Sequence, residues 1–334
     1  MLSAQESTVT SQDILQAAQR LRQSGFVNHT PLEYARELSA RLGIELYQKL
    51  EIFQRTGSFK VRGATNKLLK LKETAPDSFE KGFVTASAGN HALGMSYAAS
   101  RLGAKATIVL PQSVSPAKLE KLKGYPVELI VAEGNYDFAE VYARRLEQEQ
   151  GLVFVSAYND PEVIAGQGTV GMEALNELPD ADILLVPVGG GGLSAGVALW
   201  AKTVLPNLRV IGVQSEASPA MQHSLVAGKL VEAPELPSLA DGLAGNVEPG
   251  SITFELVQKH VDEVVLVTEE AIAEAINFYA TELQLLVEGS GAVGLAALLS
   301  GKINLAVPGK TRPKVIDILS GRNIAAAKLK KILA

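Results

Sequence analysis

Short apolar runs alternate with helix-length segments along most of the chain, and this alternation restricts the possible folds more than any other feature. Helical patterns cover 90–103, 136–151, 191–205, 269–283 and 290–301, and several end in a glycine suited to a left-handed cap. Runs typical of buried strands lie at 43–51, 82–87, 106–110, 127–132, 153–157, 183–189, 209–214, 263–268 and 314–321. Strand and helix repeated in this order predict an α/β fold with two open, mostly parallel sheet domains.

Composition narrows the class of protein and its partners. A chain of 334 residues with 47% hydrophobic content is long enough for two domains with buried cores. The net charge of -5 provides no general basic field, so neither nucleic acid nor an anionic membrane is expected as a partner. Cysteine is absent, which excludes disulfides and thiolate nucleophiles and is typical of a reducing compartment.

The N-terminal segment and the histidines add two further expectations. The first 21 residues contain no basic region followed by an apolar one, and no run approaches ~18 apolar residues. We therefore expect a soluble, cytoplasmic protein without a leader or membrane anchor. The four histidines are scattered and form no HExxH motif, so no zinc site is expected.

Three polar or glycine-rich segments follow predicted strands, where parallel sheets collect their ligands. Gly189 to Gly192 form an unbroken run that lets the backbone curl around a phosphate. The segment "SAGNH" (87–91) opens a predicted helix and suits a carboxylate, although a capping turn formed by Ser87 or Asn90 explains it equally well. Ser320, in "SGRN" (320–323), follows the last predicted strand and by itself is most simply a turn residue.

Lys60 lies in "TGSFKVRGA" (56–64), between an aromatic residue and a valine. A lysine in apolar surroundings can lose its proton and act as an amine, but a solvated lysine at a helix start is the simpler interpretation of this stretch alone. The combination changes that interpretation. A lone lysine, a carboxylate-type loop, a phosphate-type loop and a strand-end serine are together the parts needed to hold pyridoxal phosphate and an amino acid.

A dinucleotide site is the competing interpretation from a different chemical class. Gly190, Gly192 and Ala195 fit G-x-G-x-x-A, and Glu216 ends the next predicted strand, where a ribose-binding acid would lie. This interpretation, an oxidoreductase, leaves Lys60 and two of the three loop segments without a role.

The order and spacing of "GSFKVRGA", "SAGNH", "IAGQGT", "GGGGLSAG" and "SGRN" are highly specific. From about Asp13 to its end, the chain resembles the fold-type II pyridoxal-phosphate family, which includes threonine ammonia-lyase (threonine dehydratase) and serine racemase. The resemblance implies a large cofactor-binding domain from 1–80 and 156–334, and a small inserted domain from 81–155 that carries the carboxylate loop. It also implies a homodimer or homotetramer, and a short form without a separate regulatory domain.

The same resemblance implies a role for each motif residue. Lys60 would hold the cofactor as an internal aldimine and serve as the catalytic base, with Phe59 beside the cofactor ring. Asn90 would contact the 3-oxygen of the cofactor, and Ser320 its pyridine nitrogen. Backbone N–H groups would bind the phosphate at Gly189, Gly190, Gly191, Gly192 and Leu193, and the substrate carboxylate would be received by Ser87, Ala88, Gly89, Asn90 and His91. Tyr158 carries a weaker expectation as a residue that lines the pocket.

The activity implied is β-elimination on a β-hydroxy L-amino acid, most simply L-threonine or L-serine, which gives 2-oxobutanoate or pyruvate plus ammonia. Ala88 stands where racemases carry a second serine, so dehydration is expected to dominate over racemisation. Serine racemase and 3-hydroxyaspartate dehydratase are alternatives on the same scaffold, and a non-catalytic sensor is another. Gln214 and Ala220 stand where some relatives bind a divalent ion, so no tightly bound metal is expected.

Overall fold

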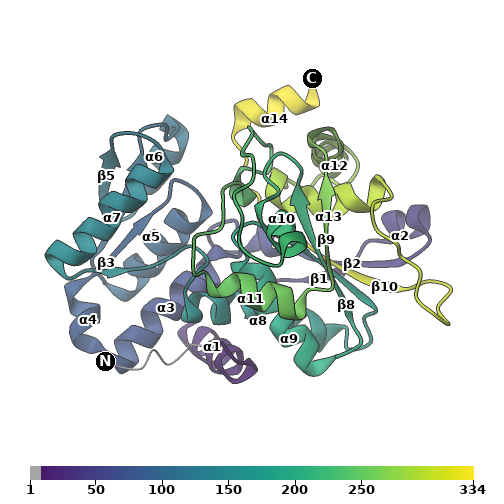
Figure 1. The fold of residues 1–334 in the computed structure, drawn as a ribbon, viewed down its shortest axis with the longest axis horizontal. Helices are drawn as coiled ribbons and strands as arrows, with labels where there is room; N and C mark the ends of the chain where they lie inside the picture. The colour runs from purple at the N-terminus through teal and green to yellow at the C-terminus, as the bar shows by residue number, and fades with distance from the viewer. Residues whose placement is uncertain (1–8) are drawn as a thin grey trace.

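The computed structural model describes residues 9–334 and contains two sheets that are parallel except at one edge (Figure 1). The larger sheet has the order β1-β2-β10-β7-β8-β9, and only the pair β1 and β2 is antiparallel. Its strands are β1 (Leu32–Tyr34), β2 (Glu45–Lys49), β7 (Ile183–Pro187), β8 (Arg209–Ser215), β9 (Glu263–Val267) and β10 (Lys314–Ile318). The smaller sheet has the order β5-β4-β3-β6, from β3 (Phe83–Ala86), β4 (Ala106–Pro111), β5 (Glu128–Ala132) and β6 (Val153–Phe154).

All nine predicted strands are present, which confirms the α/β class with mostly parallel sheets. Every residue of β7 is buried, as expected for a central parallel strand covered on both faces. The sequence reading missed β1, because this three-residue edge strand has largely exposed side chains and no apolar run.

Helices cover both faces of each sheet. Leu184 and Val186 of β7 face one core cluster and Ile183 and Leu185 face the other, because successive strand side chains point to opposite faces. The first cluster of the larger sheet includes α1 (Ser11–Ser24), α8 (Pro161–Glu177), α9 (Gly192–Val204), α10 (Ala220–Ala227) and α11 (Ile252–His260). The second includes α2 (Arg36–Leu42), α12 (Glu269–Thr281) and α13 (Gly289–Leu299), with α14 (Ala326–Leu333) at its margin.

The smaller sheet is covered in the same way. One cluster takes residues from α3 (Lys60–Thr74), α4 (Pro76–Lys81), α5 (Asn90–Leu102) and α6 (Pro116–Lys123), and the other from α7 (Tyr136–Gln150). All four of its strands fall within 81–155, whereas α3, expected in the larger unit, packs Ala64 and Leu68 into this cluster. The boundary between the two proposed domains stays a prediction.

Helices α3, α8 and α9 pack closely through glycines, which accounts for "IAGQGT". A Cβ at Gly166 would lie 2.6 Å from the Cα of Gly63, and a Cβ at Gly196 would collide with the carbonyl oxygen of Ile164. The helix that begins at Lys60 and the helix that follows the glycine run are therefore held against the same central helix, α8.

Two further expectations concern the N-terminal segment and the membrane. The first eight residues, where a leader is not expected and where the larger domain is expected to begin, lie outside the described residues. Within residues 9–334, the helices are all too short or too polar to cross a membrane.

Candidate functional site

The segment before Lys60 pairs with the segment after β10, although more than 250 residues separate them in the sequence. Ser58 and Gly321 form an antiparallel bridge. On either side of it, Phe59 N donates to Ser320 O at 3.1 Å and Arg322 N donates to Gly57 O at 2.9 Å. This pairing places Lys60, the first residue of α3, beside the "SGRN" segment.

Lys60 has the environment expected of a reactive amine. Its partly buried Nζ donates to the carbonyl oxygen of Ala157 at 2.8 Å and lies 5.2 Å from the centroid of the Phe59 ring. Burial lowers the pKa of Lys60 to about 8, and the negative charge of Glu288 opposes that shift only in part. About a tenth of the free amine is therefore neutral at pH 7, far more than for an ordinary lysine.

Cofactor capture should depend on pH accordingly. Only the neutral amine is nucleophilic, so the rate at which the apoprotein forms its visible absorption with pyridoxal phosphate should rise about tenfold per pH unit below pH 8 and level off above it. Stopped-flow absorbance between pH 6 and 10 measures this rate. A rate that still rose steeply above pH 9, as for an ordinary lysine, would contradict the assignment.

The glycine run turns sharply from β7 into α9. Gly191 has φ of 91°, a left-handed conformation that favours glycine, and it precedes the first residue of the helix. Thr253 Oγ1 donates to Gly190 O at 2.6 Å, and a Cβ at Gly190 would lie 2.6 Å from the Tyr158 ring. With that carbonyl held by Thr253, the N–H groups at the start of α9 stay available for an anion.

Tyr158 connects this loop with the lysine. Its ring lies against the glycine run, and its neighbour Ala157 accepts the bond from Lys60 Nζ. The structure therefore brings the lysine and the glycine loop to the two sides of one short segment. The expectation that Tyr158 lines the pocket stays a prediction.

The "SAGNH" segment follows β3 and includes the first residues of α5. Gly89 is the N-cap, and within the described chain no side chain caps this helix, so neither Ser87 nor Asn90 acts as the alternative cap. Ser87 Oγ instead accepts from Gly89 N at 3.2 Å. The N–H groups of the first turn remain available for a carboxylate, and the partly buried Ala88 places no hydroxyl among them.

His91 contributes only backbone to this loop. Its buried side chain points to the carbonyl oxygen of Val155, with Nε2 3.2 Å from that oxygen. Burial, with a smaller effect from the charge of Lys60, lowers the pKa of His91 to about 3. The imidazole is therefore neutral and donates its Nε2 proton to Val155, which suits a structural role.

Asn90 is held by two residues that the sequence analysis did not identify as site residues. Its Nδ2 donates to Glu288 Oε1 at 2.6 Å, and its Oδ1 accepts from Asn323 Nδ2 at 2.7 Å. Glu288 precedes α13 and is almost fully buried, and burial raises its pKa to about 7. Asn323 was visible as the last letter of "SGRN", but Glu288 lies in no motif and could be found only from the fold.

Ser320 is buried beside these groups, and its Oγ donates to Ser290 O at 3.3 Å. Its hydroxyl proton is thus directed to the backbone. The predicted contact with a pyridine nitrogen stays a prediction, as do the other individual roles.

The residues present fit pyridoxal phosphate. Lys60 provides an amine, held by the carbonyl oxygen of Ala157. The left-handed glycine turn into α9 provides a cradle for one anion, and the uncapped start of α5 provides a site for a second. In the described part of the chain, no group of three or more His, Asp or Glu side chains is arranged to hold a metal ion. Gln214 is buried and accepts from Gln222 N at 3.1 Å, so its carbonyl caps α10.

A hollow of about 340 Å³ lies beside the paired segments. Its lining includes three cationic side chains among Arg55, Thr56, Gly57, Leu93, Lys121, Tyr125, Arg322 and Asn323. Because Gly57 and Asn323 belong to the paired segments, this positively charged hollow adjoins the site. Its charge favours the approach of molecules that carry a carboxylate.

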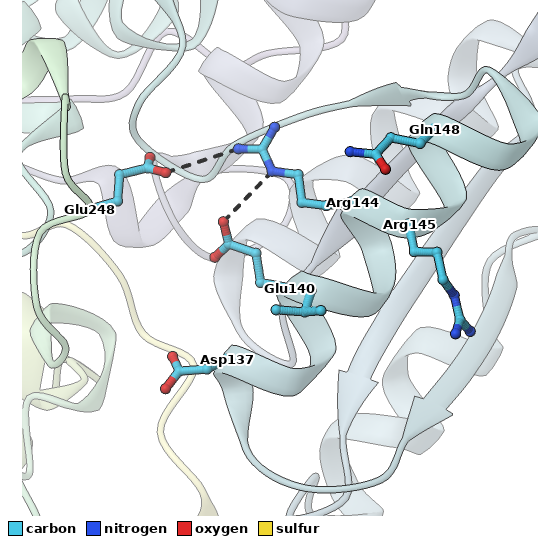
Figure 2. Close-up of a pocket in the computed structure, with 7 residues that line it drawn as sticks. Asp137, Glu140, Arg144, Arg145, Gln148 and Glu248 are labelled. Atoms are coloured by element: carbon cyan, nitrogen blue, oxygen red, sulfur yellow. Dashed lines mark ion pairs between the residues drawn. The ribbon is translucent and has the colours of Figure 1, made fainter.

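A second hollow, of about 490 Å³, lies on α7 and contains none of the predicted site residues (Figure 2). Arg144 lies between two carboxylates, 3.9 Å from Glu140 and 4.0 Å from Glu248. The backbone N of Glu248 also donates to the hydroxyl of Tyr158 at 3.1 Å. This hollow therefore lies between α7 and the segment around Glu248, which contacts Tyr158.

Fold and site together define an enzyme that uses pyridoxal phosphate, and comparison with known proteins agrees. The family described as "Pyridoxal-phosphate dependent enzyme" matches residues 23–321. The chain belongs to this family, so pyridoxal phosphate is its cofactor and the dinucleotide interpretation is set aside.

Individual relatives include enzymes named for threonine and serine. The chain is 44% identical to L-threonine ammonia-lyase of Thermotoga maritima, over 97% of this chain and 78% of that protein. It is 37% identical to L-threonine dehydratase catabolic TdcB of Escherichia coli K12, over 97% of this chain and 96% of that protein. Among solved structures, maize serine racemase has a TM-score of 0.90 and 34% identity, over 97% of this chain and 96% of that one.

Proposed function

We propose that this protein catalyses the dehydration and deamination of a β-hydroxy L-amino acid, with L-threonine as the first candidate and L-serine as the second. The products would be 2-oxobutanoate or pyruvate, with ammonia. The observation that carries the proposal is Lys60: an amine whose pKa burial lowers to about 8, between a glycine cradle and an uncapped helix start. Relatives named for threonine at 44% and 37% identity support the substrate class.

Bound pyridoxal phosphate supplies the electron sink that makes the α-proton of an amino acid acidic. The chain's own groups supply position and proton transfer. The start of α9 and the N–H groups of Gly189 to Leu193 would hold the phosphate, and the start of α5 would hold the substrate carboxylate. Lys60 Nζ, released as a neutral amine, would remove the α-proton, for which its lowered pKa is suited. Phe59, Asn90 and Ser320 would contact the cofactor ring.

Racemisation is the alternative that a specific observation favours, since maize serine racemase has nearly the same fold. Ala88 argues against it, because its methyl group cannot move a proton on the opposite face of the substrate. 3-Hydroxyaspartate dehydratase remains a substrate alternative of the same reaction type. A homodimer or homotetramer and a cytoplasmic location are also part of the proposal.

The decisive test is 2-oxo acid release by holoenzyme from L-threonine, L-serine and 3-hydroxyaspartate, with D-serine formation measured in parallel. We expect 2-oxo acid from L-threonine and L-serine, with D-serine formed more slowly than pyruvate. The variant A88S should raise the ratio of D-serine to pyruvate. Holoenzyme that forms D-serine faster than pyruvate, or that releases no 2-oxo acid from L-threonine or L-serine, would contradict the proposal.

A further inference from the structure

The contacts around Asn90 leave its amide one free donor. Asn90 Nδ2 donates one proton to Glu288 Oε1 at 2.6 Å, and Asn90 Oδ1 accepts from Asn323 Nδ2 at 2.7 Å. A primary amide has two N–H protons, so one N–H of Nδ2 has no hydrogen-bond acceptor among residues 9–334. These two contacts fix which side of the Asn90 amide is Nδ2 and which is Oδ1. The Glu288 carboxylate can only accept, so it faces Nδ2, and Asn323 Nδ2 can only donate, so it faces Oδ1.

Glu288 is itself held by the loop after β10. Its Oε2 accepts from Asn323 N at 2.8 Å, and its own backbone N donates to Gly321 O at 3.0 Å. A Cβ at position 321 would lie 2.5 Å from Glu288 Oε1, so the glycine of "SGRN" makes room for this carboxylate. Asn323 Nδ2 also donates to Thr56 O at 2.8 Å, which ties the cluster to the segment before Lys60.

Burial of the Glu288 carboxylate is energetically unfavourable if the position serves only for packing. Removing a charged group from water is unfavourable unless hydrogen bonds compensate it, and an amide of the same shape would avoid that cost. A glutamine, however, would point its own N–H group at one of the two donors that converge here, the Asn90 amide and the Asn323 backbone. A carboxylate, whose two oxygens both accept when the group is ionised, can accept from both donors.

We propose that Glu288 is a positioning residue that, together with Asn323, fixes the Asn90 amide so that its second N–H is directed at the 3-oxygen of the bound cofactor. The inference rests on the proposed function, because it takes Asn90 as the cofactor contact. It assigns a role to a buried carboxylate that lies outside every motif, and it explains why "SGRN" continues past its serine.

The experiment compares the visible absorption spectra of holoenzyme variants, since a donor at the 3-oxygen changes the proportions of the bound cofactor's absorption bands. We expect E288Q and N323A to change the band proportions in the same direction as N90A. The double variant E288Q/N90A should have the spectrum of N90A alone, because both substitutions act on the same interaction, the contact of the Asn90 amide with the cofactor. Turnover should fall about 10- to 100-fold in E288Q, as when a supporting residue of a ligand contact is lost, with KM changed less than kcat.

Asp317→Asn is the matched control. Asp317 is also a buried carboxylate whose pKa burial raises to about 7, but its side chain contacts Tyr279 in the core instead of the site. D317N should leave the spectrum of the bound cofactor unchanged. If E288Q binds no cofactor, N323A, which changes only a partly buried loop side chain, decides the question by the same spectrum.

Three outcomes would overturn the inference. The first is an E288Q or N323A holoenzyme with the spectrum of the wild type, and the second is an effect of E288Q that adds to that of N90A. The third is an N90A holoenzyme with the spectrum of the wild type. None of these results depends on turnover, so the wild-type assay with L-threonine separately decides the proposed function.

Discussion

The Lys60→Ala variant should lose at least about 10⁴-fold in kcat/KM for the preferred hydroxy amino acid, since it removes both the covalent attachment of the cofactor and the base. It should also lack the visible band that the wild type forms with pyridoxal phosphate. Absorbance spectra and 2-oxo acid release measure the two effects on the same preparation.

Two controls separate chemistry from charge and from folding. Lys60→Arg keeps a positive charge but offers no primary amine, so it should be as inactive as the alanine variant. Lys72→Ala removes an exposed lysine from the last turn of the same helix and should retain wild-type activity. Full turnover or an unchanged band in Lys60→Ala would exclude this lysine as the attachment point.

Removal of Arg62, two residues further along α3, should instead reduce stability. Arg62 is almost fully buried and makes paired hydrogen bonds of 2.7 to 2.8 Å to both Glu51 and Glu173. Arg62→Ala would leave Glu51, which is also buried, without its cation. Breaking a buried ion pair in this way costs about 3 to 5 kcal/mol, so the free energy of unfolding should fall by that amount in urea titrations.

The pH dependence of this effect has a definite sign. Burial opposes the ionisation of Glu173, but Arg62 and Lys49 outweigh it and lower its pKa from 4.5 to about 2. A lowered pKa in the folded state stabilises the protein above pH 4.5, and that contribution is lost as the pH falls towards 2. Arg62→Ala should therefore be closer to the wild type at pH 3 than at pH 7.

The double variant Arg62→Met with Glu51→Gln should recover part of the loss, because it removes both charges. Arg62→Lys, which keeps the charge but not the planar fork, should be intermediate. A loss below about 1 kcal/mol in Arg62→Ala would show that the network is replaced by water, as happens for exposed pairs.

Most of the fold and much of the site could be predicted from the sequence, because both depend on local patterns. The apolar run of β7 predicts a buried parallel strand, and the glycines after it predict a loop, without any long-range information. A chemical role for Lys60 was predicted only from the combination of motifs. Strand β1 was missed because three exposed residues carry no periodic signal.

What could not be predicted depends on contacts between distant segments. Glu288, Arg62 and Thr253 acquire their roles from residues far away in the chain, which for Arg62 is Glu173, and each is an ordinary residue type in its local sequence. "IAGQGT" was recognisable as a motif, but its purpose follows from the crossing of α3, α8 and α9, which no local pattern encodes.

The bridge between Ser58 and Gly321 has a consequence for biosynthesis. One side of it is translated more than 250 residues before the other. N-terminal segments begin to fold during synthesis, but this contact has very large sequence separation and must form late. A nascent chain that stops before Gly321 can contain Lys60 and the glycine run and still lack the segment against which Lys60 is positioned. We expect such a truncated chain to retain the cofactor less well than a chain that extends past Asn323.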